Sequence, residues 1–161
     1  MRWNGTVERL GNVDCSALSD WIAAIPFKDW PQQHQIDELL RPAMVSDPHW
    51  HQFGQYAMPF LIDNPCPPSL GNPRVSNMML SVVMPGHKIE PHQDILGEDW
   101  ICRVHVPLVT NYAAKFIIEG REYEMWVGNS YKVNIGREHS VINNGATPRI
   151  HFMFDCYENR Q

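Results

Sequence analysis

The hydrophobic positions of the chain follow one pattern before residue 74 and another after it. From Asp14 to Ile25, apolar residues recur at intervals of three and four, as on one face of a helix, and Pro26 ends the run. We expect a short amphipathic helix there and a second helical turn or two from Gln35 to Leu40. The six prolines from Pro48 to Pro73 predict mostly loop. This first part is expected to wrap a sheet rather than to join it.

After residue 74, short runs of β-branched and apolar residues are separated by Gly, Pro and Asn at a spacing of roughly eight to twelve residues, which is typical of an all-β sandwich or barrel. The runs predict about seven strands, namely Val75–Met84, Lys88–His92, Trp100–Val109, Ala114–Glu119, Glu122–Val127, Ser130–Asn134 and Arg149–Tyr157. A further short strand is expected near Ser140–Ile142, and Glu119-Gly120 and Gly128-Asn129 supply turns.

Length and composition fit one domain of ordinary size. The chain has 161 residues, of which 43% are hydrophobic, so we expect residues 1–161 to share one domain in which 1–73 cover a mainly β core formed by 74–161. The net charge is −5 and the 13 Lys and Arg residues are scattered, which argues against a nucleic-acid partner.

The cysteines and the N-terminal sequence favour a cytoplasmic protein. Cys15, Cys66, Cys102 and Cys156 form no C-x-x-C pair, and we interpret them as reduced core residues. The first ten residues lack the pattern of a signal peptide, and no apolar run approaches the roughly 18 residues of a membrane span.

The densest polar signal in the β region is His92-Gln93-Asp94. Residues two apart on an extended segment project to the same side, so one imidazole and one carboxylate can face a common centre. His139, which lies 47 residues later, could supply the third ligand of a facial triad on Fe(II). The H-x-D spacing by itself fits equally well a solvated turn after Pro91. His87 follows Pro85-Gly86 and is interpreted as a turn residue rather than a ligand.

Two arginines lie on apolar strands in the same region. Arg103 and His105 share one face of their strand, and Arg149 and His151 share one face of another. A buried arginine needs an anionic partner. Two guanidiniums beside a metal would suit a dicarboxylate, because each can bind a carboxylate with two hydrogen bonds. The hydroxyl of Ser81 can add a donor.

At these residues the sequence resembles the aspartyl/asparaginyl β-hydroxylase family of Fe(II)- and 2-oxoglutarate-dependent oxygenases. The similar stretch runs from about Ser81 to Asp155 and contains Pro91-His92-Gln93-Asp94, Arg103-Val104-His105-Val106-Pro107-Leu108, Gly128-Asn129-Ser130-Tyr131, His139-Ser140-Val141-Ile142-Asn143-Asn144 and Arg149. The H-S-V-x-N element with an arginine ten residues after its histidine is more specific than H-x-D. The resemblance implies a double-stranded β-helix, that is, a cupin-like jelly roll. The pattern before residue 74 adds a short N-terminal helix-and-loop segment.

The resemblance also implies a role for each site residue, with Fe(II) as cofactor and 2-oxoglutarate and O2 as co-substrates. His92, Asp94 and His139 are expected to bind the iron. Residues expected to bind 2-oxoglutarate are Arg149 and Ser81 at its distal carboxylate and Arg103 and His105 around its metal-proximal carboxylate.

The expected reaction is hydroxylation of a C–H bond in a small polar substrate, such as an amino acid or a peptidyl side chain. We expect Trp100, Trp126, Tyr131 and Arg137 to line the substrate pocket, with Pro48–Pro73 as a lid. Two alternatives stay open: a cupin-type metalloenzyme that does not use 2-oxoglutarate, and a non-catalytic jelly-roll binding module. Iron binding and 2-oxoglutarate binding separate the three. No membrane partner is expected.

Overall fold

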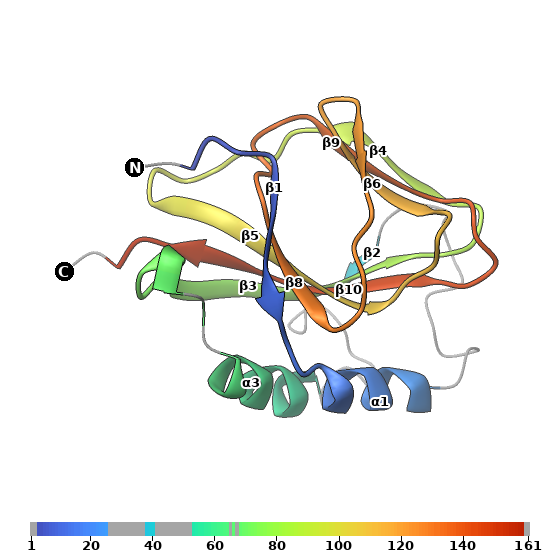
Figure 1. Cartoon of the computed structure of the whole chain (residues 1–161), viewed down its shortest axis with the longest axis horizontal. Helices are drawn as coiled ribbons and strands as arrows, with labels where there is room; N and C mark the ends of the chain where they lie inside the picture. Colours follow the sequence, from blue (N-terminus) through green and yellow to red (C-terminus); the bar gives the residue numbers. More distant parts are fainter. Residues whose placement is uncertain (1–2, 26–37, 41–52, 65, 67, 160–161) are drawn as a thin grey trace.

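Two antiparallel sheets face one another, and two helices cover the outer side of the larger sheet (Figure 1). The computed structural model describes residues 3–25, 38–40, 53–64, 66 and 68–159. The larger sheet contains, in spatial order, β1 (Val7–Asn12), β8 (Asn129–Val133), β5 (Trp100–Val109), β10 (Arg149–Tyr157), β3 (Arg74–Val83) and β2 (Glu38–Leu40). The smaller sheet contains β4 (Lys88–His92), β9 (His139–Asn143), β6 (Ala114–Ile118) and β7 (Arg121–Tyr123).

The strands expected after residue 74 are confirmed. Three of them, β4, β5 and β10, have the expected bounds, and the short strand near Ser140 is β9. The turn between β6 and β7 is formed by Glu119 and Gly120, whose φ angles are 50° and 75°. A two-residue hairpin turn of type I′ requires positive φ at both positions. The run expected to end at Val127 is shorter, because β7 ends at Tyr123.

The expectations for the first part of the chain were largely wrong. Only α1 (Ser16–Ala24) lies where a helix was expected. Glu38–Leu40, expected to be helical, forms β2 and pairs with β3, while residues 35–37 lie outside the described residues. β1 pairs with β8, so this part does join a sheet. β1 is an edge strand with a mixed burial pattern, which leaves no regular alternation to detect in its sequence.

Part of the segment expected to be loop forms α3 (Phe53–Asp63), which contains Pro59. Its buried residues Ala57 and Phe60 lie three apart and face the sheet. Trp21 of α1 stacks on Tyr56 with ring centroids 5.2 Å apart. Phe60 meets Phe152 of β10 edge to face at 5.5 Å. The prolines of this segment led to the expectation of a loop. Packing on the sheet stabilises a helix there instead.

β10 is the central strand on which the site depends. All of its residues except Tyr157 are buried. Because side chains alternate along a strand, Phe152 and Phe154 face the helices, while Arg149, His151 and Asp155 face the smaller sheet. The interior between the sheets therefore receives polar side chains from a strand whose other face is apolar.

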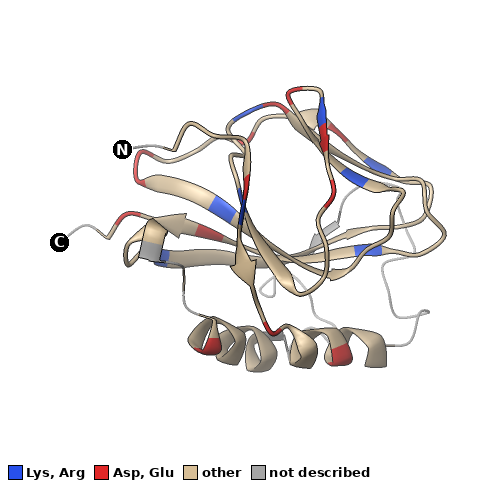
Figure 2. Cartoon of the chain, viewed as in Figure 1, with Lys and Arg blue, Asp and Glu red and all other residues tan. Residues whose placement is uncertain are grey.

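Charged residues of both signs are interspersed over the strands, and the two helices carry only acidic ones (Figure 2). Among the described residues, neither helix combines the length and the hydropathy that a membrane crossing requires. The four cysteines are free thiols, of which Cys15, Cys102 and Cys156 are buried, as expected from the sequence.

The contact between Phe60 and Phe152 predicts how strongly α3 depends on the sheet. Replacing Phe60, which is 7% exposed, with alanine should lower the free energy of unfolding by about 3–5 kcal/mol, because it leaves a cavity above β10. Ile62→Ala on the same helix is the control, since Ile62 is 73% exposed and should change the free energy by less than about 0.5 kcal/mol. Urea denaturation measures both. Equal effects of the two substitutions would contradict the packing described here.

Candidate active site

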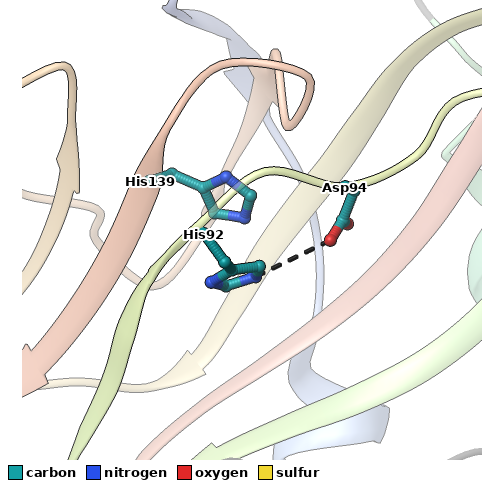
Figure 3. A group of neighbouring side chains, drawn as sticks. All are labelled: His92, Asp94 and His139. Carbon is teal, nitrogen blue, oxygen red and sulfur yellow. Dashed lines mark ion pairs between the residues drawn. The ribbon is translucent and has the colours of Figure 1, made fainter.

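The end of β4 and the start of β9 bring the H-x-D element and His139 together (Figure 3). His92 pairs with His139 across the two strands, and the centroids of their rings lie 4.3 Å apart. Asp94 follows β4, and its backbone N–H donates to the carbonyl of Ile135 at 3.0 Å. One ligand atom from each of His92, Asp94 and His139 lies within 4.8 Å of the other two. The strand pairing thus places three potential ligands around one point.

Backbone carbonyls orient both imidazoles. His92 Nδ1 lies 2.7 Å from the carbonyl oxygen of Glu90, and His139 Nδ1 lies 2.9 Å from that of Arg137. A carbonyl only accepts, so each Nδ1 must donate, and in a neutral imidazole Nε2 then carries the lone pair. Burial lowers the pKa of His139 and favours its neutral form. Two imidazoles with a carboxylate are the donor set of a facial triad, and the residues present fit Fe(II).

Arg103 has two anionic partners, Asp155 and Asp94. Arg103 Nε donates to Asp155 Oδ1 at 2.8 Å, and Nη2 donates to Oδ2 at 3.0 Å. Arg103 Nη1 donates to Asp94 Oδ2 at 3.0 Å. Sequence reasoning missed Asp155. The available signal was its position on the same face of the strand as Arg149 and His151.

The other end of the site is formed by Arg149, which is 2% exposed. Its Nη1 donates to the hydroxyl of Ser81 at 3.4 Å, and its Nη2 donates to His151 Nδ1 at 2.9 Å. His105 Nδ1 lies 3.4 Å from the same His151 atom. Burial, followed by the charge of Arg149, holds the pKa values of His105 and His151 well below the usual range. Arg149 is therefore flanked by neutral imidazoles.

One cavity contains all seven residues expected to bind metal or co-substrate. It is lined by Ser81, His92, Asp94, Arg103, His105, His139 and Arg149, and its apolar wall is formed by Ile89, Phe116, Ile135, Val141 and Met153. Buried Nε2 of His105 has no hydrogen-bond partner among the described residues. A ligand in this cavity could supply one.

The four residues expected to bind the substrate lie elsewhere. None of Trp100, Trp126, Tyr131 and Arg137 is among the described residues that line the cavity. Trp100 is buried and donates from Nε1 to Asp155 at 3.4 Å. The Tyr131 hydroxyl accepts the backbone N–H of Trp126 at 3.0 Å. Arg137 Nη1 donates to Glu119 at 2.6 Å. Alternation shows which face of a strand a residue occupies, but not its distance from the metal ligands.

The expected lid is also placed differently. α3, which forms most of the described part of Pro48–Pro73, packs on the outer face of the larger sheet (Figure 1). Residues 48–52 lie outside the described residues. α3 therefore covers the helix side of β10 rather than the cavity between the sheets.

The structure resembles several solved proteins over nearly its whole length. Viral collagen prolyl hydroxylase from Paramecium bursaria Chlorella virus 1 aligns with a TM-score of 0.59 at 10% identity, covering 98% of both chains. For a prolyl-4-hydroxylase of Pseudomonas putida the TM-score is 0.53 at 12% identity, covering 98% of this chain and 95% of the other. AviO1 of Streptomyces viridochromogenes gives 0.63 at 10% identity, covering 95% and 90%. At these identities the likeness establishes the fold, and the expected jelly roll is confirmed.

Sequence comparison is more specific. No curated protein matches the chain. The family model described as aspartyl/asparaginyl beta-hydroxylase matches residues 60–159, more than half of the chain. The match includes every residue that lines the cavity. The chain therefore belongs to the aspartyl/asparaginyl β-hydroxylase family.

Proposed function

We propose that this protein is an Fe(II)- and 2-oxoglutarate-dependent hydroxylase. The observation that carries the proposal is one cavity with three metal-ligating groups at one end and a buried arginine with a serine at the other. A dicarboxylate that chelates a metal needs this combination of features. One end of the molecule requires open coordination positions, and the other requires a fixed cation.

His92, Asp94 and His139 would hold the metal through two Nε2 atoms and a carboxylate oxygen. When bound, Fe(II) would supply the activation of O2 that is coupled to the oxidative decarboxylation of 2-oxoglutarate. Phe116 stacks on His139 at 5.7 Å between ring centroids and limits rotation of that ring. The apolar side chains beside it would limit the access of water to the buried side of the site.

Arg149 would bind the distal carboxylate, with the hydroxyl of Ser81 beside it. His105 lines the same cavity, where its ring contacts Phe116 and its Nδ1 lies 3.4 Å from His151 Nδ1. Since His105 and His151 are neutral, the guanidinium provides the positive charge at this end without a charged imidazole next to it. The viral collagen prolyl hydroxylase, described as a 2-oxoglutarate complex, supports a co-substrate of this kind in a similar fold.

The substrate would approach from the side of His92. The side chain of His92 is 41% exposed and that of Asp94 is 29% exposed, whereas His139 and Arg149 are buried. A C–H bond could therefore reach the metal from solvent while 2-oxoglutarate occupies the deeper part. A small polar molecule, such as an amino acid or a peptidyl side chain, fits this access.

Anaerobic titration tests the proposal directly. Adding 2-oxoglutarate to the Fe(II)-loaded protein should produce a visible metal-to-ligand charge-transfer band, because chelation places an electron-accepting ligand on the metal. His139→Ala should abolish the band by removing a ligand, while His87→Ala should retain it. Iron binding without a band would favour a cupin-type enzyme that does not use 2-oxoglutarate. Failure to bind iron would favour a non-catalytic binding module.

Arg149→Lys tests the co-substrate end. The lysine keeps the charge but loses the fork geometry, so the KM for 2-oxoglutarate should rise by about 10- to 100-fold, as expected for loss of a charge-assisted hydrogen bond. Iron content should not change. Arg137→Lys is the matched control, because Arg137 is bonded to Glu119 outside the cavity. An unchanged KM in folded Arg149→Lys protein would refute the assignment.

A substrate panel tests the access argument. Succinate formation coupled to product detection, measured across free amino acids, short peptides and folded domains, should be highest for the amino acids or peptides. These can bring a C–H bond past His92 into a cavity whose deeper part is buried. Coupled hydroxylation of folded domains alone would contradict a small substrate while leaving the metal and co-substrate assignments intact.

A further inference from the structure

The two oxygens of the Asp94 carboxylate have different partners. Oδ1 lies 3.6 Å from His92 Nε2, on the side of the metal ligands. Oδ2 accepts a hydrogen bond from Arg103 Nη1 at 3.0 Å. Asp94 lies beyond the end of β4 and its side chain is 29% exposed. Without a partner, such a side chain would sample several rotamers and would often point away from the metal ligands.

Arg103 is itself held in one orientation. Asp155 lies directly opposite it on the neighbouring strand and binds its Nε and Nη2 atoms through both carboxylate oxygens. The side chains of Arg103 and Asp155 are 11% and 3% exposed. A guanidinium bound in this fork geometry is planar and directional. Its Nη1 atom is therefore directed at Asp94.

Two further side chains fix Asp155. Asn77 Nδ2 donates to Oδ2 at 3.0 Å, and Trp100 Nε1 donates to Oδ1 at 3.4 Å. Asp155 thus receives hydrogen bonds from residues on β3 and β5 while it lies on β10 between them. The pair of Arg103 and Asp155 is therefore held by three adjacent strands of the larger sheet, β5, β10 and β3.

We propose that Asp155 and Arg103 are positioning residues for the metal centre. Arg103 holds Oδ2 of Asp94, so that the carboxylate offers only Oδ1 to the metal, and Asp155 holds Arg103. This inference rests on the proposed metal site. It gives Arg103 a role toward the carboxylate ligand, because three of its five N–H donors bond Asp94 and Asp155.

If Arg103 acted only through its charge, removing it would change the metal affinity in the opposite direction. A positive charge beside a metal site repels the cation, so its removal should tighten metal binding. Loss of positioning should weaken binding. A variant that removes the ion pair without changing net charge separates the two effects, because only the positioning is lost.

The test measures Mn(II) affinity of the full chain by calorimetry, without turnover. Arg103→Met/Asp155→Asn should raise the Kd by about 10-fold or more, as for loss of a partner that orients a ligand. Lys132→Met/Glu8→Gln is the matched control. It removes the 3.0 Å ion pair between Lys132 of β8, which is buried, and Glu8 of β1. Its Kd should equal that of the wild type.

Arg103→Lys supplies a second variant that keeps the charge and can still pair with Asp155. It should also weaken Mn(II) binding, with a smaller change in the Kd for 2-oxoglutarate at saturating Mn(II). Wild-type Mn(II) affinity in both Arg103 variants would overturn the inference, as would a change confined to 2-oxoglutarate. If the double variant does not fold, Arg103→Lys alone decides. Binding of Mn(II) by the wild type that is lost in His139→Ala would support the metal site independently of Arg103. If the wild type does not bind Mn(II), both proposals are overturned.

Discussion

A strand that is buried on both faces must find a partner for every polar side chain it carries, and β10 carries three ionisable ones on its inner face. Arg149, His151 and Asp155 alternate with apolar residues that pack under the helices. Leaving any of them without a partner would cost several kcal/mol, on the order of the net stability of a small domain. Residues of β3 and β5 contact all three side chains, and among the described residues only Nε2 of His151 is left without a hydrogen-bond partner on this face of the strand. The same contacts define both ends of the cavity.

The two arginines of the cavity have different surroundings. Arg103 is neutralised by a bidentate carboxylate within the chain. Arg149 donates to a hydroxyl and to a neutral imidazole. A guanidinium bound by an internal carboxylate in fork geometry is directed by it. The proposed positioning role of Arg103 follows from this contact, and the proposed binding role of Arg149 follows from its place beside Ser81 in the same cavity.

The position of the potential metal ligands depends on the smaller sheet. The pairing of β4 with β9 places His92 opposite His139, and carbonyls two residues before each histidine orient both rings. Asp94 comes from irregular backbone and is connected to the larger sheet through Arg103. The site is therefore shared by the two sheets, and the relative position of the sheets sets the distance between the carboxylate and the imidazoles. Packing of the helices on the outer face of β10 contributes to this arrangement indirectly, because it buries the strand that carries Asp155.

The sequence by itself determined the strands after residue 74, the hairpin at Glu119-Gly120 and the seven polar residues that line the cavity. These features depend on short-range alternation, on turn residues and on motif spacing, which a single chain displays directly. The expectations that failed depend on partners distant in sequence. β1 and β2 form strands because of the edges they pair with, and α3 tolerates Pro59 because Phe60 is buried against Phe152. Asp155 and Arg103 are 52 residues apart, and only the register of β10 with β5 reveals that they meet. Alternation indicates the face of the strand on which Tyr131 lies, whereas only the tertiary structure shows that Tyr131 does not line the cavity.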